Sequence, residues 1–204
     1  MTVKKPARRI GIFGGSFDPV HNAHVALARL ALAELKLDEL RWVPAGQPWQ
    51  KTRSMTPAVH REAMVRLAIE GVPNFVLDRC ELERSGPSYT LDTVRTLQAK
   101  EPEATWFLVI GQDQYAAFHT WHGWQELLGR ITLAIANRPD APMAADPQVL
   151  QVPHALVPLP MMDVSSLTDI RERIFAGLTV TDLVPPAVAR YIDQYHLYQE
   201  QPGS

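Results

Sequence analysis

The stretch Arg8-Arg9-Ile10-Gly11-Ile12-Phe13-Gly14-Gly15-Ser16-Phe17-Asp18-Pro19 carries the strongest indication of the fold. Its apolar run up to Phe13 predicts a short buried strand, and the two glycines that follow predict a tight loop. From Ala23 the apolar residues take the spacing of a helix of about three turns, which ends near Leu35. A strand, a glycine-rich loop and a helix in this order form the first part of a βαβ unit.

The same alternation continues along the chain. Short apolar runs predict further strands, and segments with helical spacing lie between them. The predicted strands are 40–43, 75–77, 105–110, 131–136 and 155–159, and the predicted later helices are 58–69, 90–99, 168–176 and 186–195. Residues 139–153 are rich in alanine, proline and glutamine without a clear period, which indicates a surface connection. We therefore expect an α/β fold, a Rossmann-like doubly wound parallel sheet with helices on both faces.

The composition limits the class of protein. The chain has 204 residues, a formal net charge of −2, 46% hydrophobic residues and 21% charged residues. This apolar fraction can fill a core, which excludes collagen-like, low-complexity and wholly disordered chains. The length predicts one domain over residues 1–204, with a C-terminal helical portion at about 164–198. A net charge near zero argues against a nucleic-acid partner and a membrane surface.

The single cysteine, Cys80, permits no intrachain disulfide and no cysteine-rich metal site. This usage suits a reducing compartment. The longest run without Asp, Glu, Lys or Arg, residues 147–162, contains prolines and glutamines that disqualify it as a membrane span. No apolar stretch of the signal-peptide kind follows the basic start of the chain. We expect a cytoplasmic protein.

Two predicted strands run directly into glycines, at Gly14 and at Gly111. In a doubly wound sheet, ligands bind at the carboxyl ends of the strands where the strand order reverses. Small residues such as Gly14, Gly15 and Ser16 let a backbone pass close to phosphates and leave N–H groups to donate. The loop fits neither the G-x-G-x-x-G fingerprint nor the Walker A pattern.

His21 and His24 distinguish this loop. Three residues apart at a helix start, they can share one face and both reach a polyphosphate. Spacing alone leaves open an ordinary strand-to-helix turn with two surface histidines. Zinc would need further ligands, and no cysteine or histidine follows at metal spacing, so we expect no protein metal site.

A second candidate segment is Ser165-Ser166-Leu167-Thr168-Asp169-Ile170-Arg171. Ser166 or Thr168 is a candidate N-cap of the helix that follows. With Arg171 they would form another helix N-terminus whose hydroxyls and guanidinium bind phosphates. The alternative is an ordinary capped helix with a solvated Arg171.

Together the two segments resemble the nucleotidyltransferases. The run from Gly14 to Pro19 with His21 and His24 resembles their (H/T)xGH signature, and Ser166, Thr168 and Ile170-Arg171 resemble their late Ser-Ser-Thr-x-Ile-Arg motif. Within this superfamily the chain is similar to bacterial nicotinate-nucleotide adenylyltransferases over roughly residues 10–198. The stretches that point there are Pro87-Ser88-Tyr89-Thr90, Ile110-Gly111-Gln112-Asp113 and Phe118-His119-Thr120-Trp121.

The chain departs from the family pattern at three places. Ala23 stands where the signature has glycine. Ser165 replaces the isoleucine of the late motif and Leu167 its second serine, which removes one hydroxyl. The family's Pro-Pro-His-Lys stretch reads Pro48-Trp49-Gln50-Lys51, so only Lys51 remains there as a candidate phosphate contact.

The resemblance implies one reaction, in which the 5′-phosphate of nicotinate mononucleotide attacks the α-phosphate of ATP and pyrophosphate leaves. It implies Mg²⁺ carried by the ATP phosphates, with Asp18 either an outer-sphere partner or a turn former. The implied catalytic residues are His21, His24 and Arg171. The implied ATP-binding residues are Gly14, Gly15, Ser16, Phe17, Gly111, Asp113, Ser166, Thr168 and Arg171. The implied mononucleotide-binding residues are Ser88, Tyr89, Thr90, Trp121 and His122, with Trp121 stacked on the pyridine ring.

Several alternatives stay open from the residues themselves. Trp121 could pack with Trp124 in the core, and Asp113 could be a helix N-cap. Glu81 reads as part of a solvated charged face. Rival functions are an adenylyltransferase for phosphopantetheine or nicotinamide mononucleotide, a cytidylyltransferase, and a nucleotide-binding module without chemistry. We expect small-molecule substrates, and either a monomer or a homodimer.

Overall fold

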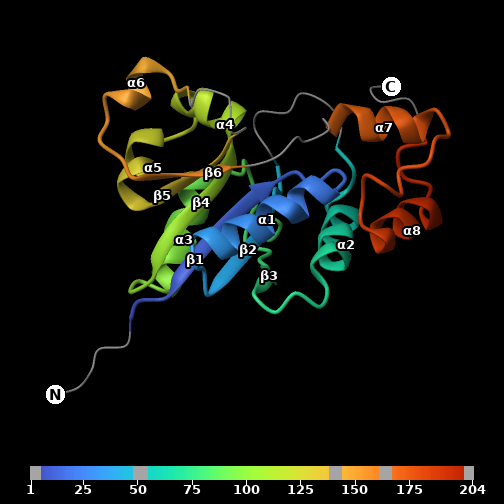
Figure 1. Cartoon of the computed structure of the whole chain (residues 1–204), viewed down its shortest axis with the longest axis horizontal. Coiled ribbons are helices and arrows are strands. Elements are labelled where there is room, and N and C mark those ends of the chain that lie inside the picture. Colours follow the sequence, from blue (N-terminus) through green and yellow to red (C-terminus); the bar gives the residue numbers. More distant parts are fainter. Residues whose placement is uncertain (1–5, 48–54, 138–143, 161–166, 200–204) are drawn as a thin grey trace.

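The computed structural model describes residues 6–47, 55–137, 144–160 and 167–199. Within these residues one six-stranded sheet has the strand order β3-β2-β1-β4-β5-β6, and every neighbouring pair is parallel (Figure 1). The strands are β1 Arg9–Gly15, β2 Glu39–Pro44, β3 Phe75–Leu77, β4 Thr105–Gly111, β5 Thr132–Asn137 and β6 Leu156–Pro160.

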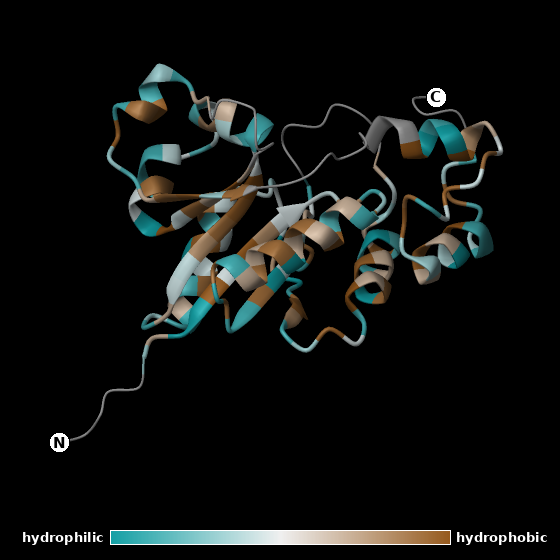
Figure 2. Cartoon of the chain, in the orientation of Figure 1, coloured by the Kyte–Doolittle hydropathy of each residue, from teal (hydrophilic) through white to brown (hydrophobic). Residues whose placement is uncertain are grey.

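Helices cover both faces of the sheet. They are α1 Asn22–Glu34, α2 Ala58–Ile69, α3 Thr90–Lys100, α4 Gln112–Ala116, α5 Trp124–Arg130, α6 Pro147–Leu150, α7 Leu167–Phe175 and α8 Pro186–Gln194, with a 3-10 turn η1 at Phe118–Thr120. One core cluster joins the sheet to α1, α2 and α8, and a second joins it to α3 and α5. Phe107 and Val109 of β4 belong to the first, and Leu108 and Ile110 to the second. Strands buried on both faces are apolar along most of their length, as Figure 2 shows.

The predicted architecture is therefore confirmed. The bounds expected for α2 and β3 agree with the structure, and most other predicted ends lie within two residues of the observed ones. The prediction missed α4, η1 and α5, which are too short to show a helical period. It also missed α6 inside the expected surface connection, where Val149 is fully buried.

The order of the strands fixes where a ligand can bind. The chain moves from β1 outward to β2 and β3, then returns past β1 to β4 and continues outward on the other side. The strand order thus reverses between β1 and β4, which end in Gly15 and Gly111. This is the switch point at which doubly wound sheets open a crevice.

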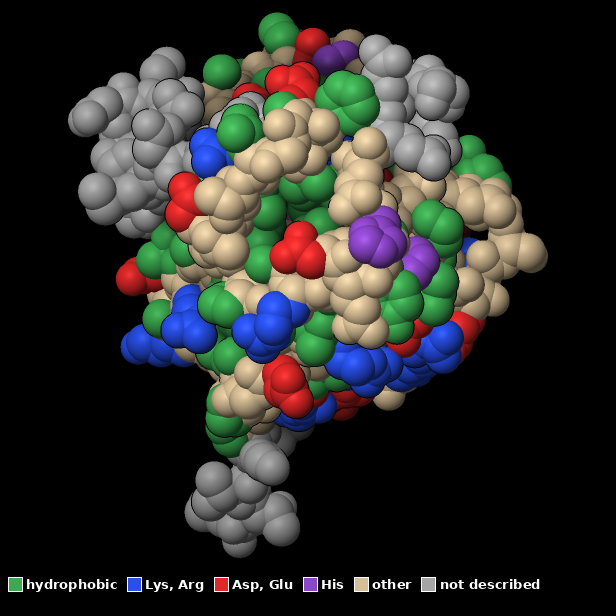
Figure 3. Space-filling model, turned by 90° about the vertical axis from the view of Figure 1, so that its right-hand side faces the viewer, with side chains coloured by type: hydrophobic (Ala, Val, Ile, Leu, Met, Phe, Trp, Pro, Cys, Tyr) green, Lys and Arg blue, Asp and Glu red, His purple; other side chains and the backbone are tan. Residues whose placement is uncertain are grey.

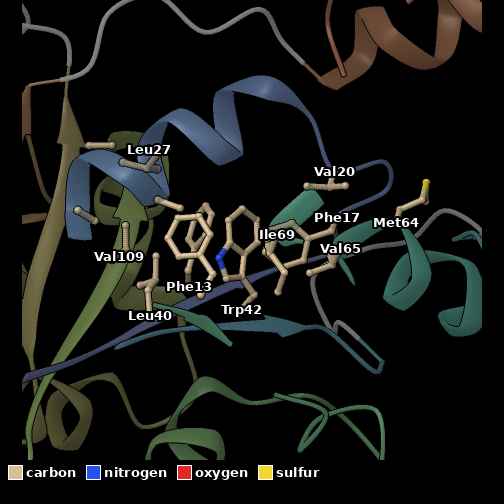
Figure 4. Close-up of a cluster of buried hydrophobic side chains, with 14 of the residues drawn as sticks. Phe13, Phe17, Val20, Leu27, Leu40, Trp42, Met64, Val65, Ile69 and Val109 are labelled. Carbon is tan, nitrogen blue, oxygen red and sulfur yellow. The ribbon is translucent and has the colours of Figure 1, made fainter. Parts of the chain in front are cut away.

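Three aromatic rings anchor the loop that follows β1. Phe13 packs edge-on against Phe17, with ring centroids 5.6 Å apart, and against Trp42, 4.9 Å apart. Figure 4 shows the three rings together among the buried side chains of this cluster. Phe17 is only 1% exposed and has a φ of 48°, a left-handed conformation that costs a residue with a Cβ about 1–2 kcal/mol. Packing of its ring holds the loop in this shape.

On the face that carries α7 and α8, Lys and Arg side chains are interspersed with Asp and Glu side chains (Figure 3). This mixture agrees with the net charge of −2. Across the described part of the chain, every helix is too short or too polar to reach from one side of a membrane to the other.

Candidate active site

His21 and His24 form the start of α1 as a reciprocal pair. The backbone N–H of His24 donates to Nδ1 of His21 at 3.3 Å, and the backbone N–H of His21 donates to Nδ1 of His24 at 3.2 Å. The rings stack with their centroids 3.6 Å apart. This is a capping box built from two histidines instead of the usual hydroxyl and carboxylate. The expectation that both rings share one face is confirmed.

The capping box also determines the tautomer that each ring adopts when it is neutral. Each Nδ1 accepts a backbone N–H, so the proton of each neutral ring lies on Nε2. His21 is 4% exposed, and burial lowers its pKa to about 4. At neutral pH, His21 is therefore a neutral ring whose Nε2–H can donate to an anion.

The low pKa of His21 makes stability depend on pH. Between about 6.5 and about 4, the unfolded chain binds more protons at this residue than the folded chain, so stability falls as the pH falls. At pH 5 the loss amounts to about 2 kcal/mol relative to pH 7. In His21→Asn the amide oxygen can still cap His24 but does not titrate, and this share of the loss should vanish. Urea unfolding of both proteins at pH 7 and pH 5 measures the difference, and an identical pH dependence would contradict the assignment.

Asp18 and Arg171 form a buried pair beside this loop. Arg171 donates from Nε to the backbone carbonyl of Asp18 at 2.8 Å, and its Nη2 pairs with the Asp18 carboxylate. Asp18 is 1% exposed and Arg171 is 7% exposed. The alternative of a solvated Arg171 is therefore wrong, because its guanidinium is buried against Asp18.

The partners of Asp18 keep it ionised. Burial alone would raise its pKa, but the hydrogen bond from Thr56 and the charge of Arg171 outweigh burial, so the pKa lies below its ordinary value. The N–H of Thr56 lies 3.3 Å from Oδ2, and the hydroxyl of Tyr198 donates to Oδ1 at 2.8 Å.

Arg61 of α2 bonds to the loop that follows β1. Its side chain is only 1% exposed. It donates from Nη1 to the carbonyl of Ser16 at 3.0 Å and from Nε to the carbonyl of Thr56 at 2.9 Å. The guanidinium thereby ties the glycine-rich loop to the segment before α2.

Gly14 and Gly111 leave open space at the ends of their strands. A Cβ built on either glycine meets no described heavy atom within 4 Å. Packing therefore does not require glycine at these two positions, which fits backbone that must stay accessible to a ligand. Phe17, by contrast, turns its ring into the core, so only its backbone can contact a ligand.

Gly14→Ala should separate binding from folding. The added methyl group enters open space, so the melting temperature should stay within about 2 °C of the parent. The resemblance implies that the triphosphate of ATP binds over this loop, where the added methyl group would take up its room, so the KM for ATP should rise about tenfold or more. Unchanged ATP kinetics in a stable Gly14→Ala protein would remove this glycine from the site.

The predicted acceptor residues come together at the start of α3. Tyr89 stacks on His122, with ring centroids 4.4 Å apart and an interplanar angle of 27°. Thr90 is the first residue of α3, and among the described residues no side-chain hydrogen bond caps that helix. An uncapped helix N-terminus offers N–H groups to an anion.

Ser88 supports the neighbouring loop. Its Oγ accepts the backbone N–H groups of Gly46 and Gln47, each at 3.1 Å. Gly46 must be glycine because a Cβ there would lie 2.2 Å from the backbone oxygen of Glu81. Ser88 thus has a clear role in holding the loop after β2 against the start of α3.

The surroundings of Trp121 bear on both roles considered for it, stacking on the pyridine ring and packing in the core. Its ring stacks on Phe118 at 5.0 Å and packs against the core cluster under α5. It is still only half-buried, whereas Trp124 is 8% exposed. The indole Nε1 of Trp121 is buried and has no hydrogen-bond partner within the described residues.

Three further predictions have different outcomes. Asp113 is exposed in the first turn of α4, whose N-cap is Gly111, so the alternative of an Asp113 N-cap is wrong. Ser166 and the side chain of Thr168 lie outside the described residues, although α7 begins at Leu167.

Glu81 was expected on a solvated face, but it is 8% exposed and accepts the hydroxyl of Thr93 at 2.7 Å. Burial raises the pKa of Glu81.

Comparisons with known proteins bear on this geometry. The model of the cytidylyltransferase-like family matches residues 12–173. A probable nicotinate-nucleotide adenylyltransferase of Methylibium petroleiphilum is 54% identical over 204 residues, covering 97% of this chain and 96% of the relative. The chain belongs to the nicotinate-nucleotide adenylyltransferases of the cytidylyltransferase-like family. A second such relative, from Albidiferax ferrireducens, is 49% identical and covers 94% of this chain and 98% of its own.

The adenylyltransferase fold is shared with a solved structure. Plasmodium falciparum nicotinic acid mononucleotide adenylyltransferase complexed with NaAD superposes with a TM-score of 0.77 at 22% identity. The match covers 95% of this chain and 98% of that one. Over so much of both chains, the likeness shows the same doubly wound architecture.

Arg61, which bonds to the glycine-rich loop of this adenylyltransferase, was not among the residues predicted from the sequence. A signal for it was present, because Arg61, Met64 and Val65 fall on one buried stripe of α2. A charged residue on an apolar helical stripe must find partners inside the protein. That spacing argument would have identified Arg61 as a structural member of the loop.

Proposed function

We propose that the chain transfers the adenylyl group of ATP to nicotinate mononucleotide with the residues of the loop after β1, the Asp18–Arg171 pair and the start of α3. A phosphate oxygen of the mononucleotide forms a bond to the α-phosphorus of ATP. The bond from that phosphorus to the bridging oxygen of pyrophosphate breaks. The products are nicotinate adenine dinucleotide and pyrophosphate, a step of NAD biosynthesis. The observation that carries the proposal is the two-histidine capping box at the reversal of strand order.

The triphosphate would lie over the loop after β1. The backbone of Gly14, Gly15 and Ser16 would donate N–H groups, and the Nε2–H groups of His21 and His24 would stabilise charge that develops on the leaving pyrophosphate. Rings that are held by a capping box are already oriented before the substrate arrives. Phe17 would contribute through its backbone.

Other parts of the site would complete ATP binding. Arg171 would bind the outer phosphates, with Ser166 and Thr168 adding hydroxyls at the start of α7. Gly111 and Asp113, at the end of β4, would contact the nucleoside. In this arrangement ATP would lie across the carboxyl ends of β1 and β4.

The mononucleotide would bind between the start of α3 and the Trp121–His122 segment. The N-terminal N–H groups of α3, with Tyr89 and Thr90, would receive the pyridine carboxylate. The partly exposed face of Trp121 would stack on the ring. Ser88 would act by holding the neighbouring loop.

Mg²⁺ would be bound by phosphate oxygens of ATP and would neutralise part of their charge. Mg²⁺ keeps several waters and needs few protein ligands. Across the described residues, no three side chains of His, Cys, Asp or Glu gather as a metal-binding cluster. The buried carboxylate of Asp18 already bonds to Arg171 and Tyr198, which does not fit a direct metal ligand. We place the reaction in the cytoplasm, where Cys80 stays reduced.

The fate of labelled phosphorus tests the reaction. With ATP labelled at the α-phosphate and nicotinate mononucleotide as acceptor, the label should appear in the dinucleotide. With ATP labelled at the γ-phosphate, it should appear only in pyrophosphate. Label from the γ-phosphate in the nucleotide product would show phosphoryl transfer and overturn the proposal.

Trp121→Ala tests the acceptor site. Loss of the stacking face should raise the KM for nicotinate mononucleotide about tenfold or more, because stacking on a ring stabilises binding by about 1–3 kcal/mol. The KM for ATP should change less than threefold, since Trp121 lies on the α3 side of the site. Steady-state kinetics with each substrate varied in turn measures both constants. Equal effects on the two substrates would assign Trp121 to packing alone.

A further inference from the structure

The segment after α8 brings Tyr198 to the phosphate-binding loop. Its hydroxyl donates to Oδ1 of Asp18 at 2.8 Å, across 180 positions of the chain. Its ring lies under the guanidinium of Arg171, with Cζ 4.9 Å from the ring centroid. Tyr198 therefore contacts both members of the Asp18–Arg171 pair, each through a different kind of interaction.

The backbone around Tyr198 adopts a conformation that is rare for residues with a Cβ. Tyr198 has a φ of 64° and His196 a φ of 52°, both in the left-handed region. That conformation is costly for residues with a Cβ and persists only where the surroundings impose it. Between them, the N–H of Leu197 closes the turn on the carbonyl of Ile192 at 3.1 Å. The turn directs the Tyr198 side chain toward Asp18.

The contacts of Arg171 define how its guanidinium is oriented. Nε and Nη2 form one edge of the planar fork, and both are directed at Asp18. The ring of Tyr198 covers one face of the plane. An arginine fixed along one edge and on one face presents its other edge, which includes Nη1, in a single direction.

We propose that Tyr198 is a positioning residue for ATP binding. Tyr198 orients Arg171 toward the triphosphate, because it holds the Asp18 carboxylate and covers one face of the guanidinium. This inference rests on the proposed role of Arg171 in binding phosphates. Tyr198 lies near the end of the described chain, outside the two motif segments that contain His21 and Arg171. Tyr198 itself need not touch the substrate.

The two kinds of contact can be separated by substitution. Tyr198→Phe keeps the ring over Arg171 and removes the hydrogen bond to Asp18. Tyr198→Leu removes both. Because bonds to a charged partner are stronger than neutral ones, Tyr198→Phe should weaken binding of a non-hydrolysable ATP analogue about tenfold, and Tyr198→Leu should weaken it further.

Tyr195→Phe is the matched control. Tyr195 lies in the same C-terminal segment, is 48% exposed, and packs on Tyr191 and His60 instead of on the loop. Removing its hydroxyl should leave affinity for the analogue within twofold of the parent. Calorimetric titration of the full chain measures all of these affinities, and thermal unfolding of each variant shows whether the fold is kept.

A double substitution tests whether Tyr198 acts through Arg171. Arg171→Lys keeps the charge and loses the fork, so Tyr198→Phe should have less than a twofold further effect in that background. Full additivity of the two losses would overturn the proposal. So would unchanged analogue affinity in Tyr198→Phe, or a loss explained by a lowered melting temperature and shared equally by the affinity for nicotinate mononucleotide.

The binding readout separates this proposal from the proposed function. A parent protein that binds the analogue but forms no dinucleotide would contradict the reaction, and the Tyr198 comparison would still decide the positioning role. A parent protein that forms dinucleotide while Tyr198→Phe binds the analogue normally would contradict the positioning role alone.

Discussion

His24→Ala is expected to lower turnover at saturating ATP and nicotinate mononucleotide by about two to three orders of magnitude. The imidazole would stabilise charge on the leaving pyrophosphate, an interaction that is strongest in the transition state. The fold should survive, because His24 is partly exposed and the backbone of α1 is unchanged. Measurement of kcat beside the melting temperature distinguishes lost catalysis from lost structure.

His60→Ala provides the control for His24. His60 is a histidine of α2 that bonds to the hydroxyl of Tyr191 at 3.0 Å and packs against the ring of Tyr195. Its loss should leave kcat within twofold of the parent. A His24→Ala protein with near-normal turnover would remove His24 from the reaction, whatever its effect on the KM for ATP.

Arg61→Ala is expected to cause a large loss of stability. The substitution leaves the carbonyls of Ser16 and Thr56 without their donor and opens a void at a side chain that is 1% exposed. These effects should lower the free energy of unfolding by about 3 kcal/mol or more. Because Arg61 bonds to the loop at Ser16, ATP affinity should fall as well. Urea unfolding gives the stability and calorimetric titration gives the affinity.

Arg66→Ala is the matched control on the same helix. The side chain of Arg66 is 64% exposed and pairs with Glu62 one turn away. Its removal should change the free energy of unfolding by about 0.5 kcal/mol or less. Comparable losses in the two variants would show that the buried bonds of Arg61 stabilise the protein no more than a surface ion pair.

The sheet could be predicted because its strands are marked locally. Runs such as Thr105–Gly111 are apolar on both faces and end in glycine, which is the pattern of a parallel strand buried between two layers of helices. The short helices α4 and α5 carry no such mark. Their residues are placed by packing of Tyr115 and Leu127 into the core under the sheet, which only the tertiary structure supplies.

The members of the candidate site could be identified more readily than their partners. The motifs single out Asp18 and Arg171 separately, but the bond between them spans 153 positions, and no local spacing encodes it. The same holds for Glu81, whose charge suggests a surface residue but whose partner Thr93 lies on a buried helix face. Burial of a charge depends on the whole fold, so single-residue character cannot predict it.

The two-histidine capping box could be predicted only in part from the sequence. The spacing of His21 and His24 correctly predicts a shared face at the start of a helix. It leaves the tautomer of each ring open, because that depends on which ring nitrogen accepts a backbone N–H. Once the geometry is known, the hydrogen bonds assign the proton of each neutral ring to Nε2.

This chain belongs to a family of enzymes that are named for adenylylating nicotinate mononucleotide. The most direct measurement is pyrophosphate release from ATP and Mg²⁺ with nicotinate mononucleotide, nicotinamide mononucleotide and phosphopantetheine tested side by side. We expect strong release with nicotinate mononucleotide and at most a small fraction of that rate with the other two acceptors. Equal or greater release with either of the others, or no release by a protein that binds ATP, would contradict this expectation.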